Sequence, residues 1–148
     1  MMDIRELYQE VIMDHNRNPR NQRQMTNPTC HARGYNPLCG DQLTVYVHLT
    51  AGVVQDISFV GCGCAISQAS ASLMTDALKG KTVKEAHALF LRFHGMVTRE
   101  DETPPLDLDK LTVLAGVRKF PARVKCATLA WHTLDAALKQ EEALVTTE

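Results

Sequence analysis

Three cysteines and one aspartate stand in short motifs whose residue types could bind a metal ion or carry sulfur. Cys39 lies two residues before Asp41. Cys64 closes a Gly-Cys-Gly-Cys run, and Cys126 lies far downstream. Zinc prefers cysteine sulfur, histidine nitrogen and carboxylate oxygen in tetrahedral sites. These residues can meet only if the fold brings separate segments together, so the pattern predicts a metal-binding or sulfur-handling site built from several segments.

The immediate surroundings of these residues favour the same chemistry. A glycine between Cys39 and Asp41 permits a tight turn, so both side chains could point into one cavity. Cys64 falls where a predicted strand gives way to a predicted helix, and a helix N-terminus favours a thiolate. Cys126 follows Lys125, and we expect that positive charge to favour its thiolate too.

The spacing differs from that of a zinc finger, because the chain has no pair of Cys-x-x-Cys motifs. Histidines could compete as ligands, although we expect most of them to be surface or partly buried residues. His132 follows Cys126 by six positions, which on a helix turns it away from that thiol. The histidines concerned are His15, His31, His48, His87, His94 and His132.

Hydrophobic periodicity predicts the elements that would position these residues. Alternation at 43–49 and 53–60 predicts an antiparallel hairpin. Residues 22–38 are polar and rich in turn formers, so we expect an irregular arm there, with a third strand only weakly indicated. Helices are predicted at 3–15, from Cys64 to Gly80, and at 83–93, 108–114 and 121–142.

The order of these elements predicts the fold class. Thr82 and Glu85 form a capping box before the helix at 83–93. We expect an exposed loop at 98–107 and fraying of the last residues. Strands come first and most helices after them, without repeats or linkers, so we expect one α+β domain over residues 1–148.

Composition narrows the class of protein. The chain has 148 residues, enough for a core, with 45% hydrophobic and 22% charged residues. A net charge of -1 gives no reason to expect nucleic acid or a membrane surface as a partner. We see no signal peptide or membrane span, and an odd count of five cysteines argues against a disulfide framework. We therefore expect a cytoplasmic protein with reduced thiols.

Four motifs in order resemble those of the U-type iron–sulfur cluster assembly proteins, the family of IscU and the NifU N-terminal domain. The likeness is greatest to its SufU-like members and covers nearly the whole chain. Each motif alone is weak, but the ordered set is specific. The motifs are LYQEVIMDHNRNPRN at 7–21, NPLCGD at 36–41, GCAISQASAS at 63–72 and KFPARVKCATL at 119–129.

The resemblance implies a fold, a ligand set and an activity. The family fold is a small three-stranded, mostly antiparallel sheet packed against about four to six helices. The family's ligands correspond here to Cys39, Asp41, Cys64 and Cys126, which in SufU-like members bind zinc. Such a protein accepts sulfur from a SufS-like cysteine desulfurase, with Cys39 as the expected persulfide acceptor, and passes it to a downstream scaffold or to apo-proteins.

Two departures separate the chain from IscU-type scaffolds. Lys125 stands where those proteins have a histidine, and residues 119–123 replace their Leu-Pro-Pro-Val-Lys stretch. The departures weaken the expectation that a dedicated Hsp70-type chaperone serves this chain. Residues 97–117 also fit the insertion that SufU-like members carry.

Cys62 leaves an alternative open. It matches the position of the second cysteine of IscU-like scaffolds, and as a fourth thiolate it could help hold a 2Fe-2S cluster. We expect instead that Cys62 is a small buried residue at a strand end, and that Cys30 is structural. Three functions therefore compete: a zinc-dependent sulfurtransferase that receives persulfide sulfur, a scaffold for cluster assembly and transfer, and a purely structural zinc domain.

Overall fold

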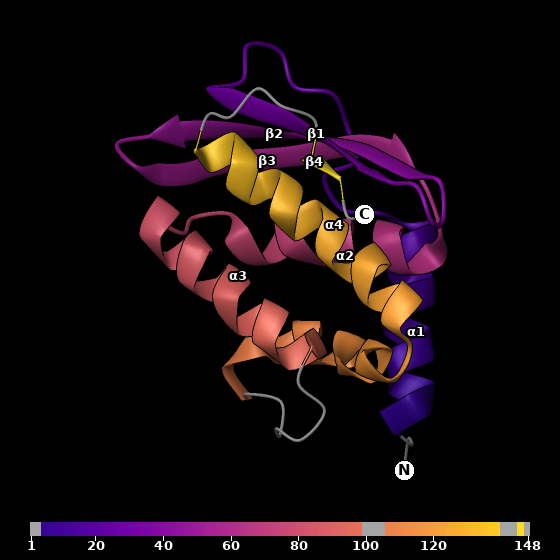
Figure 1. Cartoon of the computed structure of the whole chain (residues 1–148). Coiled ribbons are helices and arrows are strands. Elements are labelled where there is room, and N and C mark those ends of the chain that lie inside the picture. Colours follow the sequence, from indigo (N-terminus) through magenta and orange to yellow (C-terminus); the bar gives the residue numbers. More distant parts are fainter. Residues whose placement is uncertain (1–3, 99–105, 140–144, 147–148) are drawn as a thin grey trace.

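A four-stranded sheet forms one layer of the molecule, and the helices lie on one side of it (Figure 1). The computed structural model describes residues 4–98, 106–139 and 145–146. The strands are β1 (Cys30–Asn36), β2 (Asp41–Thr50), β3 (Val53–Cys62) and β4 (Val145–Thr146), in the order β3-β2-β1-β4. β1, β2 and β3 pair antiparallel, whereas β4 pairs parallel to β1. The predicted α+β class with a mostly antiparallel sheet is confirmed.

Two details of the sheet differ from the prediction. Part of the expected irregular arm is the regular strand β1, whose inward residues Cys30, Ala32, Gly34 and Asn36 are buried. Because these residues are small or polar, the strand shows no hydrophobic alternation. The expected frayed end contributes β4, which extends the edge of the sheet beside β1.

Four α-helices and one 3₁₀-helix are described: α1 (Ile4–Arg17), α2 (Ala65–Leu78), α3 (Val83–Thr98), η1 (Leu106–Lys119) and α4 (Pro121–Leu138). The capping box is formed, since Thr82 and Glu85 exchange hydrogen bonds of 3.0 Å between side chain and backbone N–H. The predicted helix at 108–114 is longer and of the 3₁₀ type. Most of the predicted loop at 98–107 lies outside the described residues.

The core lies between the inner face of the sheet and α4, which crosses beneath it with α2 alongside (Figure 1). Trp131 of α4 is fully buried and stacks on Phe93 of α3, with ring centroids 4.5 Å apart. Val45 and Phe59 line the sheet side. In the described parts of the chain, no helix is long and apolar enough to cross a membrane.

The first motif fixes α1 to α2. His15 is 1% exposed, and its Nδ1 lies 2.7 Å from Ser72 Oγ. The same hydroxyl oxygen accepts the Arg20 N–H at 2.8 Å, and Asn21 donates to Thr75 Oγ1 at 3.0 Å. These bonds anchor the segment after α1 against α2, so the histidine of this motif has a structural role.

Candidate metal centre

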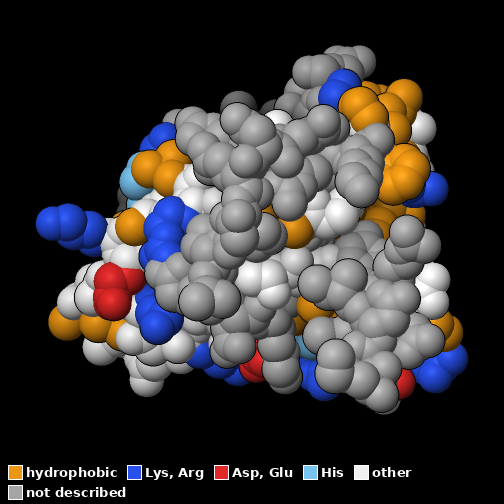
Figure 2. All heavy atoms as spheres, turned by 90° about the horizontal axis from the view of Figure 1, so that it is seen from below, with side chains coloured by type: hydrophobic (Ala, Val, Ile, Leu, Met, Phe, Trp, Pro, Cys, Tyr) orange, Lys and Arg blue, Asp and Glu red, His pale blue; other side chains and the backbone are white. Residues whose placement is uncertain are grey.

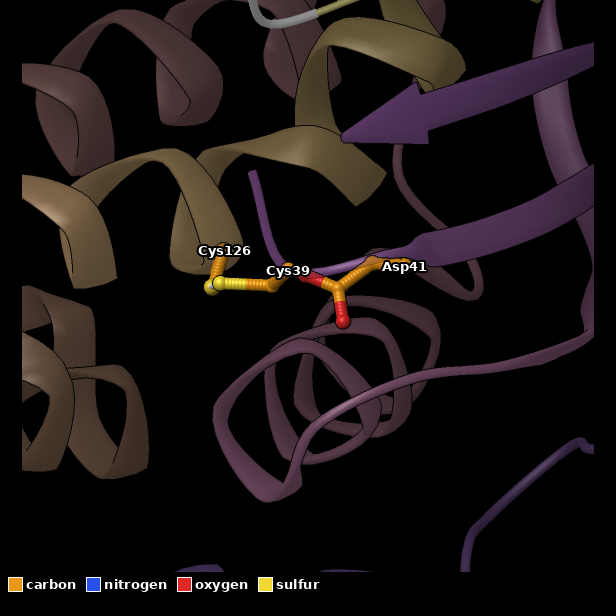
Figure 3. A group of neighbouring side chains, drawn as sticks. All are labelled: Cys39, Asp41 and Cys126. Atoms are coloured by element: carbon orange, nitrogen blue, oxygen red, sulfur yellow. Dashed lines mark hydrogen bonds between the residues drawn. The ribbon is translucent and has the colours of Figure 1, made fainter. Parts of the chain in front are cut away.

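Cys39, Asp41 and Cys126 form one group of potential metal ligands at an end of the sheet (Figure 3). Their ligand atoms all lie within 4.8 Å of one another. Cys39 lies on the turn between β1 and β2, Asp41 begins β2, and Cys126 lies in α4. Asp41 and Cys126 are 0% exposed, whereas Cys39 is partly exposed. The fold thus brings together residues that are 87 positions apart, and leaves Cys39 the most accessible of the three.

The hydrogen bonds of Asp41 fix its carboxylate. Oδ1 accepts the backbone N–H of Cys64 at 2.8 Å, and Oδ2 accepts Nδ2 of Asn36 at 3.1 Å. A buried carboxylate needs such partners to offset its lost hydration. Each carboxylate oxygen still has a further lone pair, so Asp41 can bind a metal while it keeps both bonds.

Cys64 lies beside this group and caps α2. Its Sγ accepts the N–H of Ser67 at 3.5 Å and is 3.9 Å from Asp41 Oδ2. The structure therefore places Cys64 next to the three-residue group, at the junction of strand and helix that the sequence predicts.

The geometry of the sulfurs fits a zinc ion. Cys126 Sγ and Cys39 Sγ are 3.3 Å apart. Two Zn–S bonds of about 2.3 Å at a tetrahedral angle separate their sulfurs by about 3.8 Å, so a shift of a few tenths of an ångström suffices. Three thiols and a carboxylate are also donors of the kind that zinc accepts. Cys39, Asp41 and Cys126, with Cys64 as the fourth ligand, could hold it.

The pKa of Cys126 shifts in the opposite direction to the one expected from Lys125. Burial raises the pKa of its thiol, and hydrogen bonds with Cys39 and Cys64 raise it further. Burial of the thiol therefore outweighs any lowering of its pKa by the positive charge of Lys125. Arg123, one helical turn before Cys126, provides a nearby cation. Its pKa is raised by a hydrogen bond with Cys126 and by the charges of the cysteines around it.

The other cysteines lie apart from this group. Cys62 is exposed rather than buried, which corrects the prediction. It pairs with Gln42 on the face of the sheet turned away from the helices and lines a hollow of about 450 Å³ together with Arg33 and Tyr35. Cys30 is buried as expected, and burial raises the pKa of its thiol.

The histidines of the described chain also lie outside the group. His31 stacks on Tyr46, and His48 contacts Thr29. His87 lies 3.1 Å from Asp135. The rings of His94 and His132 contact Phe90 and each other.

Two residues of the site were missed as functional by sequence reasoning. Asn36 contacts both Asp41 and Cys126, and Gly63 leaves room for the Asp41 carboxylate. Asn36 lies within a recognised motif, but only the pairing of β1 with β2 shows that it faces Asp41. The signal is therefore a strand register, which the weak pattern before Cys39 did not provide.

Comparison with known proteins gives a consistent result. The family model described as NifU-like N terminal domain matches residues 7–146. The protein named zinc-dependent sulfurtransferase SufU of Bacillus subtilis (strain 168) is 43% identical over 136 residues, which cover 92% of each chain. The protein named iron-sulfur cluster assembly scaffold protein IscU of Streptococcus pyogenes serotype M1 is 40% identical over 137 residues, which cover 93% of this chain and 86% of that one.

A solved structure shares the fold. It is described as a putative iron-sulfur cluster assembly scaffold protein for the SUF system, FiSufU, from Fervidobacterium islandicum AW-1. The two structures align with a TM-score of 0.82 at 32% identity, over 89% of this chain and 96% of the other. The predicted resemblance is confirmed by sequence and by structure, and the chain belongs to the family of NifU-like N-terminal domains.

Proposed function

We propose that this chain is an iron–sulfur cluster assembly protein that binds zinc and accepts persulfide sulfur from a cysteine desulfurase at Cys39. The observation that carries the proposal is the contrast within the site. Cys39 is partly exposed, while its neighbours Asp41 and Cys126 are fully buried. One thiol can thus reach a partner while the other side chains stay fixed. The relative named as a zinc-dependent sulfurtransferase supports this assignment.

The transfer step requires a thiolate. A zinc ion bound by Cys39, Asp41, Cys64 and Cys126 would keep these thiols deprotonated at neutral pH. The Cys39 sulfur attacks the terminal sulfur of the desulfurase persulfide and forms a new S–S bond. The old S–S bond breaks, and the desulfurase cysteine leaves as a thiolate. Sulfur is transferred with no net oxidation, and Cys39 then carries the persulfide.

Exposed hydrophobic side chains support docking of a partner near Cys39. Leu38, which precedes Cys39, is 61% exposed. Phe120, directly before α4, is 62% exposed. Both belong to segments that carry a candidate ligand, and large exposed apolar side chains are enriched where proteins bind one another. The partner under this proposal is a SufS-like desulfurase in the cytoplasm, with a downstream scaffold or apo-proteins as sulfur recipients.

The test is sulfur acceptance by the zinc-loaded chain. We expect the chain to accelerate cysteine turnover by a SufS-type desulfurase and to gain one sulfur atom, visible by intact-mass spectrometry under non-reducing conditions. Cys39→Ala should lose both effects. Cys62→Ala is the matched control, because it removes an exposed thiol outside the ligand group. Undiminished stimulation by Cys39→Ala would refute the proposal.

A second candidate function is a scaffold for a 2Fe-2S cluster, since a relative at 40% identity is named as a scaffold protein. Under this alternative Cys62 should matter as a ligand. Its exposed position on the sheet face turned away from the helices argues for the sulfur acceptor instead. We therefore expect Cys62→Ser to leave zinc binding unchanged. Anaerobic reconstitution with iron and sulfide tests the scaffold function. A stable cluster that forms in the parent chain and is lost in Cys62→Ser would favour the scaffold.

A further inference from the structure

Asn36 connects the parts of the ligand group without being a ligand itself. It ends β1, is 0% exposed, and lies opposite Asp41 in the antiparallel pair. Its Nδ2 donates to Asp41 Oδ2 at 3.1 Å and to Cys126 Sγ at 3.5 Å. One amide group thus touches two ligands that come from different elements.

The acceptor groups of Asn36 hold the turn that carries Cys39. Its Oδ1 accepts the N–H of Leu38 at 3.3 Å, and its backbone carbonyl accepts the N–H of Gly40 at 2.8 Å. Cys39 lies between these two anchored residues. The amide therefore fixes the base of the turn with its oxygen and the buried ligands with its nitrogen.

We propose that Asn36 is a positioning residue, which keeps Asp41 and Cys126 aligned for the metal whether or not Cys39 is in contact with them. A side chain with both donor and acceptor atoms is needed, because one end contacts oxygen and sulfur lone pairs and the other a backbone N–H. Partners that orient ligands typically contribute about 10- to 100-fold to metal affinity. The inference rests on the proposed function only for the identity of the metal.

The test compares Asn36→Asp with the parent chain. The aspartate keeps an oxygen for Leu38 but removes both N–H donors and adds a charge beside Asp41. We expect zinc affinity, measured by competition with a chromophoric chelator, to fall about 10- to 100-fold. We also expect the Co²⁺-substituted protein to change its d–d bands and thiolate-to-cobalt charge-transfer intensity. A purely structural role would leave this spectrum unmoved.

Asn21→Asp is the matched control. Asn21 also donates through Nδ2 to a side chain, Thr75 Oγ1 at 3.0 Å, but far from the ligands. Its variant should keep the parent affinity and Co²⁺ spectrum. If Asn36→Asp does not fold, Asn36→Ser keeps a short acceptor, lacks the reach of the amide, and gives the same comparison.

The outcomes separate this inference from the proposed function, because no desulfurase enters the metal measurements. Parent-like affinity and an unchanged Co²⁺ spectrum in a folded Asn36 variant would overturn the positioning role. If the parent chain failed to accept sulfur while the Asn36 variants still lost metal affinity, the proposed function would fall and the positioning role would stand.

Discussion

Gly63 determines how closely the connection between β3 and α2 approaches Asp41. A Cβ added at Gly63 would lie 2.5 Å from Asp41 Oδ1 and 3.1 Å from its Cγ. Gly63 is not among the described glycines with positive φ, so its backbone conformation is one that alanine can adopt. An alanine there is hindered only by the nearby Asp41 carboxylate. The absent side chain thus allows the hydrogen bond from the Cys64 N–H to the carboxylate.

We expect Gly63→Ala to displace the Asp41 carboxylate and to lower zinc affinity by about 10- to 100-fold, the usual effect of disturbing the surroundings of a ligand. Competition titration with a chelator measures the change. Gly95→Ala, in α3, is the control, since a Cβ there meets nothing within 4 Å. A Gly63→Ala protein with parent affinity would show that the carboxylate is not held where we place it.

His132 makes the stability of the fold depend on pH. Burial lowers its pKa, and the nearby His94 lowers it further. The folded state therefore binds the proton less readily than the unfolded state, so stability falls as the pH drops below the ordinary histidine value of about 6.5. We expect His132→Gln to lose less stability than the parent between pH 7.5 and pH 5.5, as measured by urea unfolding. An identical loss in both proteins would contradict this assignment.

At the scale of elements, Gly34 sets the contact between β1 and α4. A Cβ at this position would collide with Thr133 Oγ1 and lie 3.0 Å from Leu129 Cδ1. We expect Gly34→Ala to destabilise the protein by about 1–3 kcal/mol, the usual cost of overpacking, as measured by chemical denaturation. Adding Thr133→Ala removes the colliding group, so the double variant should be less destabilised than the sum of the single changes. Strict additivity would indicate that the strand and helix do not meet there.

The elements differ in how far their sequences predict them. The hairpin of β2 and β3 and the helices α2 and α3 have clear periodicity and caps, and the structure confirms them. The sequence indicates β1 only weakly, because its buried positions include Gly34 and Asn36, whose burial depends on α4 and on Asp41. Local pattern cannot reveal an environment that other segments create.

At the scale of the whole molecule, the ligand group ties together the β1–β2 turn, the start of α2 and α4. Zinc should therefore stabilise the entire fold, by about 4 kcal/mol when free zinc is 1,000 times its Kd. For a chain of this length that corresponds to a rise of roughly 8–16 °C in Tm. Differential scanning calorimetry with zinc and with excess chelator measures the shift. Cys126→Ala should show almost none, and a chelator-insensitive parent Tm would contradict the site.

The candidate ligands were available from the motifs, but their arrangement was not. Family resemblance assigned Cys39, Asp41, Cys64 and Cys126, whereas only the three-dimensional structure shows that Cys62 faces the other way. Only Gly63 separates Cys62 from Cys64, yet β3 ends at Cys62 and α2 begins directly after Cys64. Because the chain passes from a strand to a helix here, the two cysteines point in different directions, which their spacing alone does not reveal.

The wide separation of Cys39 and Cys126 has a consequence for the chain while it is being made. During synthesis from the N-terminus, Cys39 and Cys64 emerge from the ribosome before the helix that carries the third thiol. At usual rates the delay across these 87 residues is on the order of 10 s. Under the proposed function, an unfinished chain would offer only part of the zinc ligand set, and the set would be complete only when α4 has docked. We therefore expect zinc to bind tightly only after α4, the last long helix, has been made and has packed against the sheet.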